Sequence, residues 1–306
     1  MLSEHQDELF EILKYMGLPA LVSAALILFV IEWLGGAKQS AAGAALAIIV
    51  GAVVGLIGRD LGSVLKEGLP RDQSLDTILI ENLRKIVPDI LWYNSGTWDR
   101  LPWAVLGALS VGRVAGRSDG GWFLRGAAAI GIAWWLVPEA LREQHFWLVP
   151  AYAGTIWLLW IILDDQGSQP GGSSVSLCAS LVMLTAAPVI LLAGSMKLMD
   201  SAFVLGFAMA GIWLIAFWRT VDVSGATPAI AVALPSLLLI CQQTVSSELP
   251  WYVYASPAFA PLVLIPAMLV QDGPRWALHL MRLLLILLPL AFAMVILMRE
   301  TGESFF

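Results

Sequence analysis

Three basic side chains stand at the start of the last apolar segment, in the stretch RWALHLMRLLLILLPLAF. On a helix that turns by about 100° per residue, Arg275, His279 and Arg282 fall within about 60° of one another. A stripe of positive charge at this place could bind an anion or a lipid headgroup. The alternative is an anchor, in which long basic side chains extend to the membrane surface and bind nothing specific.

The depth of Arg282 bears on that choice. If the hydrocarbon began only after Arg282, the remaining residues would be too few to cross a core of about 30 Å. We therefore expect Arg282 to lie about one helical turn inside the boundary. Two further arginines, spaced i and i+4, are predicted on the same side of the membrane, with Arg125 shortly after them. The candidate anion or headgroup site consists of Arg275, His279, Arg282, Arg113 and Arg117.

Prolines are concentrated near the C-terminal end, where eight of the 16 fall within 228–289. The segment PWYVYASPAFAPLVLIPAML cannot form a straight helix, because each proline removes a backbone hydrogen bond. We predict a kink or break between Ser256 and Pro266, facing other helices. Backbone carbonyls freed at membrane depth must face protein or water. The break therefore indicates either a kinked packing helix or a cavity, with Gln242, Gln243, Pro257 and Pro261 as its candidate lining.

The sequence predicts no catalytic residue, metal site or cofactor. It contains neither a G-x-x-x-x-G-K-[ST] phosphate loop nor an H-E-x-x-H zinc motif, and it has only three histidines. Cys178 and Cys241 each lie inside an apolar run, which is typical of small core residues. Whether the protein is an enzyme stays open, with a non-enzymatic role favoured.

The composition places the chain in a lipid bilayer. Of its 306 residues, 59% are hydrophobic and only 13% are charged. Soluble domains carry about a quarter charged residues. The net charge of −6 is spread over loops and forms no basic face, so nucleic acid is not an expected partner.

A helix needs about 20 apolar residues to cross the hydrocarbon core. This length predicts an all-α, polytopic integral membrane helix bundle in a single membrane domain over 1–306. We expect about ten transmembrane helices, of which the third, fourth and eighth are short. They are 17–34, 40–58, 101–116, 122–138, 146–163, 175–193, 201–218, 228–243, 251–270 and 276–298.

Two polar segments accompany the predicted spans. Residues 1–16 form an amphipathic N-terminal segment at the interface. Residues 59–100 form a polar loop that contains an amphipathic helix, 74–87, because apolar residues recur there at i, i+3 and i+4. We predict that this helix lies flat on the membrane, with its apolar side chains Ile78, Leu79, Leu83 and Ile86 facing the hydrocarbon.

A stripe of small residues, Gly43, Ala47, Gly51 and Gly55, follows the second span at four-residue steps. Such a stripe allows two helices to approach closely. It indicates either internal packing or a homodimer face.

The distribution of basic residues predicts the orientation. With ten spans, ten of the 17 lysines and arginines fall on the side that holds both termini, largely because of 59–100. The positive-inside rule then places both termini in the cytoplasm. We expect a bacterial inner (plasma) membrane protein.

Three functions follow as hypotheses. The span count and the broken ninth helix favour a small-solute transporter or permease. The alternative is a non-catalytic subunit or scaffold of a membrane complex, and the second alternative is a lipid-modifying membrane enzyme. A cavity at mid-membrane would favour the first, a solid core with an exposed apolar flank the second, and a lateral cleft holding His279 and a carboxylate the third. The expected partners are the bilayer and either other membrane subunits or a second copy.

Overall fold

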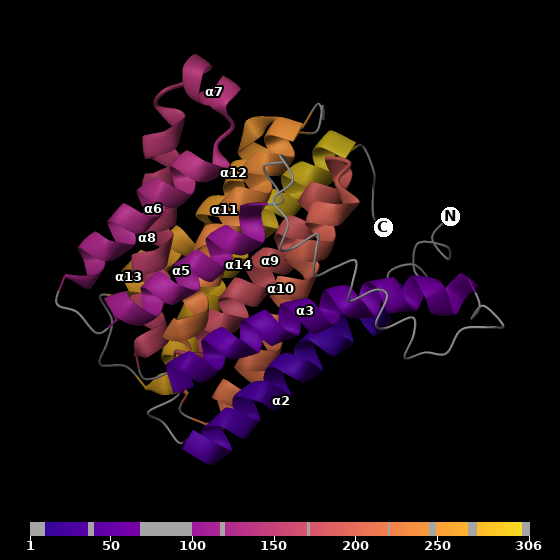
Figure 1. Ribbon diagram of the computed structural model, residues 1–306, viewed down its shortest axis with the longest axis vertical. Helices are drawn as coiled ribbons and strands as arrows, with labels where there is room; N and C mark the ends of the chain where they lie inside the picture. The colour runs from indigo at the N-terminus through magenta and orange to yellow at the C-terminus, as the bar shows by residue number, and fades with distance from the viewer. Residues whose placement is uncertain are drawn as a thin grey trace.

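The computed structural model describes most of the chain, and every element in the described part is a helix. The described residues are 10–35, 40–67, 100–116, 120–169, 172–219, 221–244, 249–268 and 274–301. The predicted surface helix 74–87 and most of the N-terminal segment 1–16 lie outside them. The helices, labelled in Figure 1, are η1 (Leu13–Gly17), α2 (Leu18–Gly35), α3 (Ser40–Glu67), α5 (Leu101–Ala115), α6 (Gly121–Leu136), α7 (Glu139–Gln144), α8 (Leu148–Ser168), α9 (Ser173–Leu192), α10 (Met196–Trp218), η4 (Ser224–Ala226), α11 (Thr227–Thr244), α12 (Trp251–Phe259), η5 (Ala260–Leu264), α13 (Ile265–Met268) and α14 (Arg275–Thr301).

Within the described residues, seven helices are long and apolar enough to cross a membrane. They are Phe10–Leu34, Ser40–Arg59, Leu148–Ser168, Ser173–Leu192, Met196–Trp218, Ser224–Gln243 and Trp276–Arg299. The predicted span 228–243, expected to be short, is thus part of a helix of full length. Three other predicted spans correspond to shorter helices, namely α5, α6 and the broken segment Trp251–Ala267. The all-helical, membrane-embedded class agrees with the prediction.

The centre of the bundle is α11. Its side chains are buried along almost the whole helix, from Thr227 to Cys241. It packs against α5 and α8 on one side and α9, α10 and α12 on others, as its central place in Figure 1 illustrates. Side chains from all of these helices form one continuous apolar cluster. The middle of the protein is therefore filled by packed side chains.

Helices α2 and α3 lie side by side along one edge of the bundle and pack against α10 (Figure 1). The small-residue stripe of α3 forms this contact. A Cβ added to Gly51 would lie 2.9 Å from the Cβ of Ala208, and one added to Gly55 would lie 2.8 Å from Val204 Cγ1. Contacts this short leave no room for a side chain, so the stripe serves internal packing, as one of its two interpretations predicted.

The proline-rich segment is broken, as the sequence predicted. Helix α12 ends at Phe259, a 3-10 turn (η5) follows, and the short helix α13 resumes at Ile265. Pro257 and Pro261 are buried at the break. The segment packs against α14 and α8, while Phe259 and Ile265 remain exposed. The break therefore faces other helices on one side and the surrounding apolar phase on the other.

Candidate functional site

The side chain of Arg282 is completely buried, although it lies in a helix apolar enough to cross a membrane. It is the eighth residue of α14 and shares a buried stripe with Leu278, Ile286 and Leu290. The anchor interpretation is therefore wrong for Arg282, because a side chain that extends to the membrane surface would be exposed. The guanidinium instead turns into the protein.

Three neutral side chains accept hydrogen bonds from Arg282. Its Nε donates to Gln166 Oε1 at 2.7 Å and its Nη1 donates to Ser174 Oγ at 3.0 Å. Its Nη2 donates to Gln169 Oε1 at 3.3 Å. The acceptors come from the last turn of α8, the residue after it and the first turn of α9. A planar guanidinium with donors on several sides suits such a divergent set, so Arg282 ties α14 to the α8–α9 connection.

The side chain of Gln169 connects the guanidinium of Arg282 to the carboxylate of Asp165 through hydrogen bonds. Gln169 accepts from Arg282 through Oε1 and donates from Nε2 to Asp165 Oδ2 at 2.8 Å. The amide therefore stands between a cation and an anion, and its dipole is aligned with both. Hydrogen bonds arranged in this way strengthen one another in a medium of low dielectric constant.

A second charged pair lies beside the first. Arg125 near the start of α6 forms an ion pair with Asp164 of α8, and both side chains are largely buried. The hydroxyl of Thr227, the first residue of α11, lies 3.5 Å from Asp164 Oδ1 and donates to the backbone oxygen of Ser224 at 2.8 Å. The pair thus connects α6 and α8 next to the start of α11.

The start of α3 joins the same region through backbone contacts. Ser40 Oγ accepts from the backbone N–H of Asp222 at 3.3 Å, and Asp222 Oδ1 accepts from the N–H of Ser224 at 2.9 Å. A Cβ on Gly225 would lie 1.7 Å from the backbone oxygen of Ala41, so only glycine fits there. We name the whole cluster the polar junction; its side chains are Ser40, Arg125, Asp164, Asp165, Gln166, Gln169, Ser174, Asp222, Thr227 and Arg282.

Six buried side-chain polar atoms of the described residues have no hydrogen-bond partner, and two of them, Arg125 Nε and Gln166 Nε2, belong to the polar junction. Gln166 Nε2 has none, since its Oε1 faces Arg282 and so fixes which end of the amide is the donor. Glu32 Oε1, at the end of α2, also has none. The polar junction is therefore strongly but not completely satisfied.

The structure places the predicted anion-site residues as follows. Arg282 is buried, His279 is half-buried on the same helix, and Arg113 is exposed on α5. Arg275 begins α14, but its side chain lies outside the described residues, as does all of Arg117. The acceptors shown for Arg282 belong to α8, α9 and the connection between them. A site shared by all five residues stays a prediction.

The predicted cavity-lining residues are divided between two environments. Gln242 and Gln243 are exposed at the end of α11, whereas Pro257 and Pro261 are buried. None of the four lines the groove described next. That they line a cavity stays a prediction.

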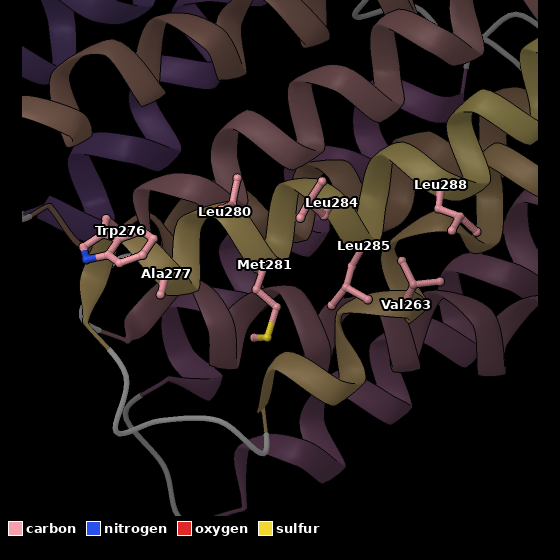
Figure 2. A pocket seen from close by; sticks show the side chains of 8 residues that line it. All are labelled: Val263, Trp276, Ala277, Leu280, Met281, Leu284, Leu285 and Leu288. Atoms are coloured by element: carbon pink, nitrogen blue, oxygen red, sulfur yellow. The ribbon is translucent and has the colours of Figure 1, made fainter.

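A groove of about 490 Å³ runs along the outer side of α14, between this helix and the 3-10 turn η5. Figure 2 shows its lining side chains spread along α14, with Trp276 at one end and Leu288 at the other, near Val263. Every lining residue is apolar: Val263, Trp276, Ala277, Leu280, Met281, Leu284, Leu285 and Leu288. Because its lining contains no charged side chain, the groove has no group that could neutralise a charged solute.

Sequence reasoning missed the partners of Arg282. The run DDQGSQPGGSS over 164–174 has no apolar residue and lies between the predicted spans 146–163 and 175–193, so the sequence predicts it outside both spans. In the structure α8 continues to Ser168 and buries Gln166. One signal was present: an arginine inside an apolar helix needs polar partners at the same depth, and this run lies on the same predicted side of the membrane.

Comparison with known proteins gives no relative: no family model, no curated protein and no solved structure matches the chain.

Proposed function

We propose that the protein is a non-catalytic subunit or scaffold of a membrane protein complex. The observation that carries this proposal is the solid interior around α11 combined with an apolar outer flank. A transporter moves its substrate through the middle of the bundle, and this requires a polar path between helices. In the described residues, that middle is filled by the continuous apolar cluster.

The buried polar groups support the same proposal, because most of them bond to one another. Arg282 and Arg125 are held by side chains of α8 and α9. Deeper in the core, the hydroxyls of Tyr152 and Ser236 form a hydrogen bond between α8 and α11. Groups engaged in bonds between helices stabilise the bundle and are not available to coordinate a passing solute.

The proposal includes ten membrane crossings. The seven long helices would be joined by α5, α6 and the broken segment Trp251–Ala267. At 1.5 Å per residue, the 15 residues of α5 span about 22 Å, which is shorter than the hydrocarbon core of about 30 Å. Short helices are accommodated where the bilayer thins around them. Ten crossings place both termini on one side, which we propose is the cytoplasmic side of a bacterial inner membrane.

A small-solute permease is the second candidate, and the break at η5 is the observation that favours it. Broken helices line substrate sites in many transporters. Here the described groove beside the break opens on the outer flank and contains neither a histidine nor a carboxylate. The groove thus gives the lipid-modifying enzyme no support, and a polar path would have to open elsewhere.

The test is the composition of the particle extracted from its own membrane. The tagged protein would be extracted without detergent in polymer nanodiscs, and the mass of the particle would be measured. We expect a second membrane polypeptide in fixed ratio, also after stringent washing. Isolation as a lone chain of 33.1 kDa, or as a homodimer alone, would contradict the proposal.

A further inference from the structure

We propose that the groove between α14 and η5 holds one acyl chain of a bilayer phospholipid. This inference concerns the outer flank and does not depend on the scaffold role. The groove belongs to the span Trp276–Arg299, so its position along α14 is that of the hydrocarbon. The ligand must therefore come from within the membrane.

The lining chemistry fits a hydrocarbon chain. From Ala277 onward, the lining residues of α14 recur at i, i+3, i+4, i+7, i+8 and i+11, so they form one continuous apolar face. No lining side chain carries a charge, and the one N–H donor is the indole of Trp276, at the end of the groove. In lipid there is no hydrophobic driving force, and contacts between chains depend on close packing. A groove that touches a chain on more than one side provides such packing.

The dimensions fit one chain in one leaflet. From Trp276 to Leu288 the helix rises by twelve residues, or about 18 Å. Half of the hydrocarbon core is about 15 Å. A transmembrane helix about 10 Å wide and equally long would fill about 1,400 Å³, roughly three times the groove volume of 490 Å³. A partner helix could only lie across the groove, whereas an extended acyl chain can enter it.

The broken helix explains why the groove exists. Pro261 has no backbone N–H and is buried at the start of η5. The chain then proceeds as a 3-10 turn up to Leu264, which places Val263 at the groove. The interruption leaves a space beside α14 that a straight, continuous helix would fill, and we infer that lipid fills it instead. Ala277, which is small, lies at the other end of the groove, next to Trp276.

The two ends of the groove differ. Trp276, the second residue of α14, lies at one end of the groove and is 69% exposed. Indole rings prefer the interface between hydrocarbon and headgroups. We therefore place the ester end of the lipid near Trp276 and the methyl end near Leu288 and Val263, as the groove runs in Figure 2.

Photo-crosslinking with a phosphatidylcholine that carries a diazirine in its acyl chain tests the proposal. The full chain would be reconstituted in vesicles containing this lipid, irradiated and digested, and adducts would be mapped by mass spectrometry. We expect several-fold more adducts at Met281, Leu284 and Leu285 than at Phe292 and Val295, which are exposed on α14 beyond the groove. Equal labelling of the two sets would overturn the proposal.

A matched pair of variants sharpens the test. Ala277→Trp fills the groove and should reduce adducts at Met281 and Leu284 to the level of Phe292. Phe292→Trp changes the exposed surface outside the groove and should leave the enrichment unchanged. Persistence of the enrichment in Ala277→Trp would overturn the proposal. A crosslink from a diazirine amino acid at Leu284 to a polypeptide instead of to lipid would do so as well.

Discussion

The two faces of α14 differ in how they make contacts in an apolar medium. The inner face carries Arg282 between Leu278 and Ile286, and its guanidinium is bonded to α8 and α9. From Leu280 to Val295 the exposed residues of α14 are all apolar, and this outer face bounds an open groove. The inner face is thus held to its neighbours by a few polar contacts, whereas the outer face can make contacts only through the packing of apolar side chains.

This difference shows which contacts determine how α14 is oriented in the bundle. In lipid, an apolar side chain loses little by facing outward, so apolar contacts alone set helix rotation weakly. A buried cation sets the rotation of its helix strongly, because its N–H groups must lie next to hydrogen-bond acceptors. Arg282 therefore fixes both the rotation and the depth of α14, and the outer face is left free to meet lipid.

The largest effect is expected for Arg282→Leu. The change leaves the buried Gln166 and Ser174, and the half-buried Gln169, without the donor Arg282. It should lower the free energy of unfolding by about 3–5 kcal/mol. Thermal unfolding in mild detergent would measure it. Arg299→Leu, at the exposed end of the same helix, is the control and should stay within about 0.5 kcal/mol of the parent. Equal stability of the two variants would show that the junction is not structural.

Truncation of Ile286 on the inner face should have the next largest effect. Ile286 is completely buried. Ile286→Ala should cost about 2 kcal/mol, at the low end of the range for cores, because the unfolded helix in lipid keeps this side chain in apolar surroundings. The same unfolding assay measures the loss. A cost below about 0.5 kcal/mol would mean that the inner face is loosely packed.

The ion pair between Arg125 of α6 and Asp164 of α8 should contribute less to the free energy of unfolding than the buried Ile286. A double-mutant cycle with Arg125→Gln and Asp164→Asn should give a coupling free energy of about 1–2 kcal/mol, since both side chains are mostly shielded from solvent. The four proteins would be compared by denaturant-dependent unfolding. Additive effects of the two substitutions would remove this pair from the polar junction.

The smallest effect is expected on the outer face. Leu284 is 59% exposed and borders the groove. Leu284→Ala should change the free energy of unfolding by no more than about 0.5 kcal/mol in lipid nanodiscs. It forms a matched pair with Ile286→Ala, two residues along the same helix. A larger loss for Leu284→Ala than for Ile286→Ala would reverse the assignment of the two faces.

Local sequence features predicted much of the fold. Apolar length located the seven long helices, and the prolines located the break before Pro266, because both effects act along the chain. Counting residues predicts that Arg282 lies about one turn inside the boundary, and that depth stays a prediction. The direction of its side chain could not be predicted, because a helix that is apolar on all sides gives no signal of which side faces the protein. The acceptors Gln166 and Ser174 are 116 and 108 residues away in the chain. Only packing brings them to Arg282.

The same limit explains why the helix that contains the predicted span 146–163 continues beyond it, to Ser168. A polar run is typical of a loop when its side chains face water. Here Gln166 is buried in the last turn of α8 because Arg282 lies opposite it. Helix α8 continues to Ser168 because Arg282, which is distant in the sequence, donates a hydrogen bond to Gln166 Oε1.

The central claim is that the interior is solid and not a path for water or solute. The two native cysteines test it directly, since both thiols are free and buried, Cys178 on α9 beside the backbone of Arg282 and Cys241 on α11. The protein in vesicles would be treated with a water-soluble maleimide, applied to both sides of the membrane, and its labelling would be counted by mass. We predict no labelling of either cysteine until the protein is unfolded in SDS, and rapid labelling of Cys178 or Cys241 in the folded protein would contradict the account.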